Sequence, residues 1–312
     1  MQVYLVLAAL VVLALSQQWL VPRLDHPALA TWSTIFVAIV VQSIPFLVGG
    51  VLLAAVIATL LSERALRRLV PSNPALGVPV AGLAGVALPG CECASVPVAG
   101  SLISRGVAPS VALTFLLAAP AVNPVVLVST AVAFSGQPEM VLARFLASLL
   151  TAVAVGWLWL RFAGRVPMLQ RPNAHDHGGS TTLAFLASVR HDFVHAAGFL
   201  VLGAMIAAAI NTFVPREIID SVAGNALLAV VVMAAFAFVV ALCSEADAFV
   251  AVSLSAFSDT AKLVFMVVGP AMDVKLASME SGQFGGTFAL RFVPLVLVVA
   301  VLSACGVGWW LL

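Results

Sequence analysis

The sequence predicts an all-α membrane protein that crosses the bilayer several times. Of its 312 residues, 63% are hydrophobic and only 9% are charged, which is too little charge for the surface of a soluble protein of this length. A membrane-spanning helix needs about 20 mostly apolar residues, and long apolar segments follow one another along the chain. They lie at about 3–21, 32–61, 77–104, 107–135, 139–163, 191–213, 225–257, 260–280 and 287–312.

The polar loops divide these segments into regions. Residues 1–31 are predicted to form a first transmembrane helix and a loop, because they lack the basic start of a signal peptide. Two membrane repeats are expected at 32–163 and 191–286. Between them, 164–190 carries charged residues and a Gly-Gly pair, and it is predicted to be a solvated cytoplasmic loop. Residues 287–312 are predicted to form a C-terminal transmembrane helix.

Four landmarks recur in the same order in the two predicted repeats. An apolar run with a central glycine is followed by a short charged stretch, a cysteine at a polar break, and a Phe-to-Asn/Asp run with an internal Pro-Ala pair. Because the spacing between landmarks is also nearly constant, we interpret them as an internal duplication. The pairs are 46–55 with 199–208, 63–69 with 216–222, Cys91 with Cys243, and 115–123 with 265–273.

The basic loops predict how the two repeats are oriented. Lys and Arg concentrate on the cytoplasmic side, so the loops at Arg64–Arg68 and Arg161–Arg190 are both expected there. An even number of crossings must then separate them, although three apolar segments lie between. Residues 77–104 are the best candidate for a re-entrant segment, because Pro89-Gly90 interrupts them. The repeats would then be inverted, with broken helices at the membrane midplane, as in many secondary transporters. Three crossings and a parallel repeat are the alternative.

The first candidate site follows the Pro89-Gly90 break, where Cys91, Glu92 and Cys93 occur in an apolar segment. Ionisable groups at membrane depth usually line a cavity or a substrate path. Thiolates prefer soft ions such as zinc, cuprous copper and trivalent arsenic, so the two thiols favour capture of such a species. The alternative is that both cysteines only pack as small apolar residues. We assign that packing role to Cys305.

The second candidate site is the corresponding break, with Cys243, Glu245 and Asp247. Two ionised carboxylates this close would repel each other, so we expect one of them to hold a proton. That proton could be exchanged as substrate moves. The alternative is that the segment only reaches the water interface.

Asn123 and Asp273 complete the predicted site, because each follows a proline in a long apolar run. Proline frees a backbone carbonyl, and unwound carbonyls coordinate ions in discontinuous membrane helices. A turn at a helix end is the alternative for each. We therefore predict three overlapping sets: substrate-binding residues Cys91, Cys93, Cys243, Asn123 and Asp273; proton-coupling residues Glu92, Glu245 and Asp247; and metal ligands Cys91, Cys93, Cys243 and Glu245.

The motifs also identify a family resemblance. Pro89–Cys93, Val96-Pro97 and Leu113–Pro124, together with Cys243–Phe249 and Gly269–Lys275, resemble the bacterial predicted permeases that include the organoarsenical (methylarsenite) efflux permeases. The Cys-Glu-Cys form is similar to a branch of unassigned substrate. The resemblance implies a multi-pass permease of the bacterial cytoplasmic membrane with cysteines in its transport path. It leaves room for a small membrane partner protein and for a homo-oligomer.

These observations predict a secondary transporter that moves a thiophilic metal or metalloid species, with efflux as the expected direction. No phosphate-binding loop, nucleotide fingerprint or nucleophile–base arrangement is visible. We therefore expect no enzymatic activity, no cofactor and no nucleic-acid partner. Two alternatives are a membrane-embedded redox or sulfur-handling protein and a membrane subunit of a metal-handling complex.

Overall fold

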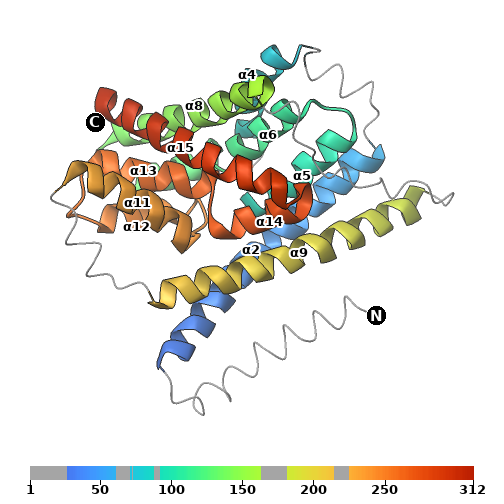
Figure 1. The fold of residues 1–312 in the computed structure, drawn as a ribbon, viewed down its shortest axis with the longest axis horizontal. Coiled ribbons are helices and arrows are strands. Elements are labelled where there is room, and N and C mark those ends of the chain that lie inside the picture. The colour runs from blue at the N-terminus through green and yellow to red at the C-terminus, as the bar shows by residue number, and fades with distance from the viewer. Residues whose placement is uncertain (1–26, 61–70, 72, 88–91, 163–180, 214–224) are drawn as a thin grey trace.

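The computed structural model describes residues 27–60, 71, 73–87, 92–162, 181–213 and 225–312, and all its regular elements are helices (Figure 1). This confirms the predicted all-α class. The predicted transmembrane helix within residues 1–31 and the predicted loop at 164–190 fall mostly outside the described residues.

Four of the described helices are long and apolar enough to cross a membrane. Their outer faces carry large apolar side chains such as Val41, Leu290 and Trp309. Since such faces would be unstable in water, they are expected to contact lipid. The four helices are α2 (Pro27–Leu60), α8 (Pro138–Phe162), α9 (Thr181–Phe213) and α15 (Gly286–Leu311).

The other apolar segments within the described residues are broken into shorter helices. None of these pieces reaches the roughly 20 residues that span a bilayer. The pieces are α4 (Pro74–Ala84), η2 (Gly85–Ala87), α5 (Glu92–Ser104), α6 (Pro109–Ala118), α7 (Pro124–Ala133), α11 (Ala226–Val240), α12 (Asp247–Ser253), α13 (Asp259–Ala271) and α14 (Val274–Phe284).

Polar caps and prolines start the helices on either side of these breaks. The side chains of Asn73 and Asn225 accept hydrogen bonds from the first turns of α4 and α11, and Ser258 does so for α13. Such caps satisfy amide groups that have no partner within the helix. Prolines at the first positions of α4, α6 and α7 fit because that position needs no amide donor.

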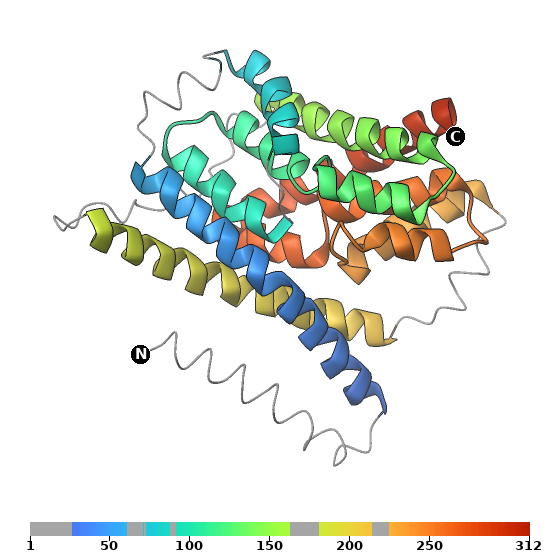
Figure 2. The same cartoon turned by 180° about the vertical axis from the view of Figure 1, so that it is seen from behind.

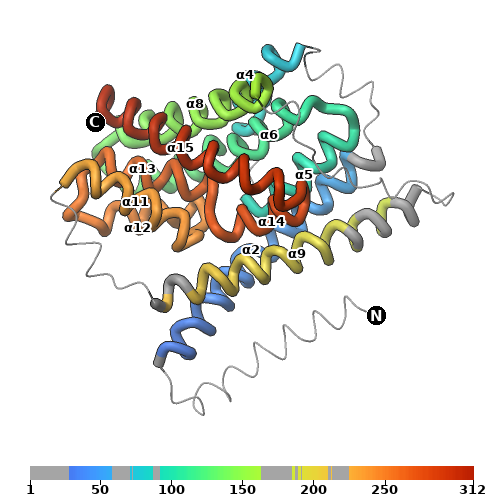
Figure 3. Tube along the Cα trace, in the orientation of Figure 1, coloured from blue at the N-terminus to red at the C-terminus, as the bar shows by residue number. Residues whose placement is uncertain are grey.

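The long helices run in opposite directions in pairs. The C-terminal end of α2 lies near the N-terminal end of α9, and the two helices pack along each other (Figures 1 and 2). The C-terminus of α15 likewise lies near the start of α8, and Trp159 of α8 packs edge-on against Phe288 and Phe292 of α15. The chain trace shows the short helices gathered between the two pairs (Figure 3).

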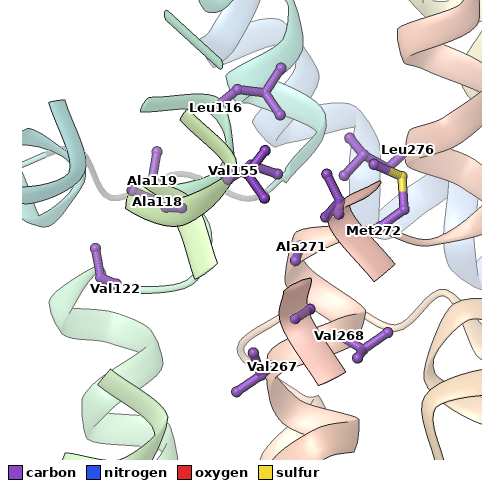
Figure 4. Packing of buried hydrophobic residues seen from close by; sticks show 14 of the residues in the cluster. Leu116, Ala118, Ala119, Val122, Val155, Val267, Val268, Ala271, Met272 and Leu276 are labelled. Atoms are coloured by element: carbon purple, nitrogen blue, oxygen red, sulfur yellow. The ribbon is translucent and has the colours of Figure 1, made fainter. Parts of the chain in front are cut away.

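The apolar core lies where the short helices of the two halves meet. One side of the core is formed by Leu116 of α6, Ala119 of the following turn and Val155 of α8. The opposite side is formed by Val268 of α13 and by Met272 at its C-terminal end (Figure 4). All five are buried. The breaks on either side of this core are therefore held in fixed positions.

Two glycines allow the long helices to approach the short ones closely. A Cβ atom on Gly50 of α2 would overlap the backbone of Ala94 in α5. On Gly203 of α9, a Cβ atom would lie 2.7 Å from the Cα atom of Lys275 in α14. Real Cβ atoms do not approach backbone this closely, so glycine is required at both crossings. Each long helix therefore packs directly against a short helix that begins at or next to a predicted site residue, Glu92 for α5 and Asp273 for α14.

Candidate functional site

The first break places two buried site residues at the start of α5. Glu92 and Cys93 are fully buried in the protein interior. Glu92 occupies the first turn of the helix, where unpaired backbone amides favour a negative charge. Cys91 lies outside the described residues.

Glu92 is paired with a lysine from the other half of the chain. The Nζ atom of Lys275, in α14, donates to the Oε1 atom of Glu92 at 2.6 Å, and both side chains are completely buried. The Oδ2 atom of Asp273 lies 3.7 Å from the same ammonium group. Since an isolated buried charge is very costly, each of these charges depends on the others.

The second break brings another thiol to the same region. Ala241 ends α11 in the left-handed conformation, with φ at 52°, and no regular helix forms again until Asp247. Cys243 is buried between these points. It lies within electrostatic range of Cys93, Glu92 and Lys275. The two breaks therefore bring one thiol each to the same buried ion pair.

A second buried ion pair lies beside the second break. Arg144 of α8 donates to the Oδ2 atom of Asp247 at 2.7 Å, and both side chains are almost completely buried. The guanidinium group also donates to the hydroxyl of Thr130 at 2.8 Å and to the carbonyl of Ser244 at 3.0 Å. This pair, like the first, joins the two halves of the chain.

Asn123 and Asp273 have the same local role at matching positions. The Asn123 side chain accepts a hydrogen bond from the amide of Val126 and starts α7. The Asp273 side chain accepts one from the amide of Leu276 and starts α14. Both residues are fully buried. Asp273 also faces Lys275, so it belongs to the charged cluster as well as to the helix cap.

The structure therefore gathers most of the predicted residues and separates a few. Glu92 and Asp273 contact the ammonium group of Lys275, and Cys93 and Cys243 lie within electrostatic range of it. Half-buried Glu245 interacts electrostatically with Glu92, whereas Asp247 is held by Arg144. Among the described residues, no three metal-binding side chains are arranged as a metal site. Because Cys91 lies outside them, the predicted metal set stays a prediction.

Sequence reasoning missed Arg144, Lys275 and Glu280, all three of which are fully buried. A signal was present for each. Arg144 is the one ionisable residue between Met140 and Leu160, and a lone charge at membrane depth is a site candidate by default. Lys275 and Glu280 follow the second Pro-Ala landmark. The sequence prediction considered the cysteines and the acidic residues at the breaks, and it did not include the basic residues that pair with those acids.

Spanning helices, helices broken at membrane depth and buried charges at the breaks define a multi-pass membrane transport protein. More specifically, the chain belongs to the ArsP_1 predicted permease family, whose profile matches residues 28–307. This confirms the predicted permease resemblance and a multi-pass location in the bacterial cytoplasmic membrane. Family membership indicates transport rather than catalysis.

Two curated relatives support the same assignment. The chain is 32% identical to the UPF0718 protein YcgR of Bacillus subtilis, over 86% of this chain and 94% of that protein. It is 30% identical to a putative two-component membrane permease complex subunit of Streptococcus mutans, over 88% of this chain and 94% of that protein. No solved structure gives a significant match.

Proposed function

We propose that this permease moves a thiophilic metal or metalloid species across the cytoplasmic membrane, in the direction of efflux. The observation that carries the proposal is the approach of Cys93 and Cys243, one from each break, to the same buried Glu92–Lys275 pair. Thiol sulfur binds soft ions and trivalent arsenic in preference to hard ions. Cys91, two residues from Cys93, would supply a third sulfur ligand.

The surrounding charges suit a substrate that arrives with little net charge. Lys275 neutralises Glu92 and lies close to Asp273, and Arg144 neutralises Asp247. Glu245 is the predicted acid that no salt bridge holds among the described residues, and it is only half-buried. In this proposal Glu245 completes the metal-binding set and balances charge, whereas Glu92 and Asp247 exchange protons only when their basic partners move away.

We also propose that the two halves form an inverted repeat. The series α2, α4, α5, α6, α7, α8 and the series α9, α11, α12, α13, α14, α15 have the same order of long and short helices. Asn123 and Asp273 cap corresponding helices, and Gly50 and Gly203 occupy matching positions in α2 and α9. Because α2 opposes α9 and α8 opposes α15 (Figures 1 and 2), inversion is favoured over a parallel repeat.

Reporter tags provide the test of the inversion. Tags inserted near Arg67 and near His177 should both report the cytoplasm, and a tag near Arg216 should report the outer face. These three positions lie outside the described residues, so the result is independent of the geometry above. A tag near Arg216 that reports the same side as the tag near His177 would support parallel halves.

A second candidate function is that of a membrane subunit in a permease complex. The Streptococcus mutans relative is named as a subunit of a two-component membrane permease complex, and the two chains match over most of their lengths. In this case the same cysteine site would act only with a partner protein present. Purification of the full chain from its native membrane would show whether a second membrane protein remains bound.

Alkylation of the cysteines tests the proposed function directly. Full-length protein is treated with a maleimide in the presence of arsenite, methylarsenite, zinc or thiosulfate, and the labelled peptides are identified by mass spectrometry. We expect an arsenical or zinc to slow labelling of Cys93 and Cys243, with labelling of Cys305 unchanged. Protection by thiosulfate alone would favour the sulfur-handling alternative, and reversible oxidation of the thiols without protection would favour the redox alternative.

A further inference from the structure

Glu280 is a buried acid that neither the thiol site nor the two ion pairs use. It lies in α14 and is completely buried. Neither of its carboxylate oxygens has a hydrogen-bond partner among the residues that the structure describes. By contrast, every other fully buried acid in those residues, Glu92 and Asp273 included, lies within 4.0 Å of a basic side chain.

The face of α14 that carries Glu280 is turned away from the cationic side of the site. Lys275, Ser278 and Gly282 form the face that packs against Phe199 and Gly203 of α9. Glu280 lies about 140° around the helix from Lys275. One turn further on, Phe284 shares its face and packs against Phe288 of α15. Glu280 therefore shares a helix face with an aromatic residue, and no ion pair joins it to a basic side chain among the described residues.

The charged groups on the neighbouring helices do not compensate Glu280. On α15 the charged residue is Arg291, which is exposed. On α5 it is Glu92, which is already paired with Lys275. The charged and titratable residues of α9, from Arg190 to His195, lie on the helix that packs against the other face of α14. Among the described residues, the charge that bears on Glu280 is that of Asp273, and it is negative.

We propose that Glu280 is a proton-binding site of this permease, a carboxylic acid that stays neutral near physiological pH. An ionised carboxylate buried without a partner costs far more free energy than its neutral acid, and a nearby negative charge adds to that cost. Of the three predicted proton-coupling acids, Glu92 and Asp247 already have cationic partners, and Glu245 is only half-buried. The role of Glu280 as the proton carrier rests on the proposed transport function, but its neutral state does not.

Carboxyl-specific labelling tests this assignment without any transported substrate. Dicyclohexylcarbodiimide adds to protonated carboxyl groups in apolar surroundings and forms a stable N-acylurea. Full-length protein in detergent is treated over a series of pH values, and the modified residues are identified by mass spectrometry. We expect labelling of Glu280 at neutral pH that falls only in more alkaline solution. We expect the Glu280→Gln variant to lose this label and the Glu245→Gln variant to keep it.

Thermal stability gives a second and independent readout. The Gln side chain has nearly the size of a neutral Glu, so Glu280→Gln should melt close to wild type. Absence of the Glu280 label at neutral pH would overturn the assignment, because a protonated carboxyl group should react. A strongly destabilised Glu280→Gln variant would also overturn it, because the amide should replace a neutral, unpartnered acid at little cost. A permease that shows this label but no cysteine protection would instead contradict the proposed substrate class alone.

Discussion

Replacement of Lys275 by Met should destabilise the protein more than neutralisation of any charged residue that lies outside the two buried ion pairs. The substitution leaves Glu92 and Asp273 buried without their cation. Removal of one partner from a buried ion pair typically costs about 3–5 kcal/mol. The measurement is the thermal unfolding of the purified full-length protein in detergent, supported by the amount of protein recovered from membranes.

The double variant Lys275→Met/Glu92→Gln separates the loss of a charge partner from the loss of packing. It removes both charges of the shortest contact, so it should recover much of the stability that Lys275→Met loses. Lys262→Met is the matched control, because Lys262 pairs with the more exposed Asp259 at 3.1 Å. Exposed pairs contribute only about 0–1 kcal/mol. A double variant less stable than Lys275→Met would show that the pair is not an electrostatic unit.

The general architecture could be predicted because it follows from composition and from helix-breaking residues. Apolar length predicts the spans, and the short helices α4, α6 and α7 each start at a proline. The start of α5 at Glu92, which follows Pro89-Gly90 in the sequence, and the helix starts at Asn123 and Asp273 agree with this pattern. These effects act within a few residues along the chain, so the sequence contains them directly.

The partners within the site could not be predicted, because they depend on tertiary contacts. Glu92 and Lys275 are 183 positions apart, and Arg144 and Asp247 are 103 apart. No periodicity in the sequence relates residues this far apart. A charged residue in an apolar segment is recognisably unusual, but the sequence does not show which residue pairs with it. The sequence predicts that either Glu245 or Asp247 holds a proton, but that reasoning lacks Arg144, which pairs with Asp247. Glu280 was missed because it ends the predicted apolar segment 260–280, and the sequence does not distinguish an exposed acid at a segment end from a buried one.

Replacement of the site cysteines by serine should abolish the resistance of cells to the transported metal or metalloid, while the protein stays in the membrane. Cys93→Ser and Cys243→Ser each remove a thiol close to the Glu92–Lys275 pair, and Cys91→Ser removes the third predicted ligand. Serine has nearly the same size but its hydroxyl is a hard, weak ligand for soft ions. We expect at least about a tenfold loss of resistance or efflux for each variant, and each factor of ten corresponds to about 1.4 kcal/mol of lost interaction.

The assay compares cells that express each variant on arsenite, methylarsenite, zinc and copper, with metal content per cell as the readout. Cys305→Ser is the matched control, since Cys305 is partly buried in the terminal span α15, away from both breaks. It should behave as wild type.

Serine variants at positions 91, 93 and 243 that all keep wild-type efflux would contradict the proposed thiol site. An essential Cys305 would reverse the division between binding and packing cysteines. Serine variants that lose efflux although present at the wild-type level in the membrane would place the lost interaction in substrate binding rather than in folding.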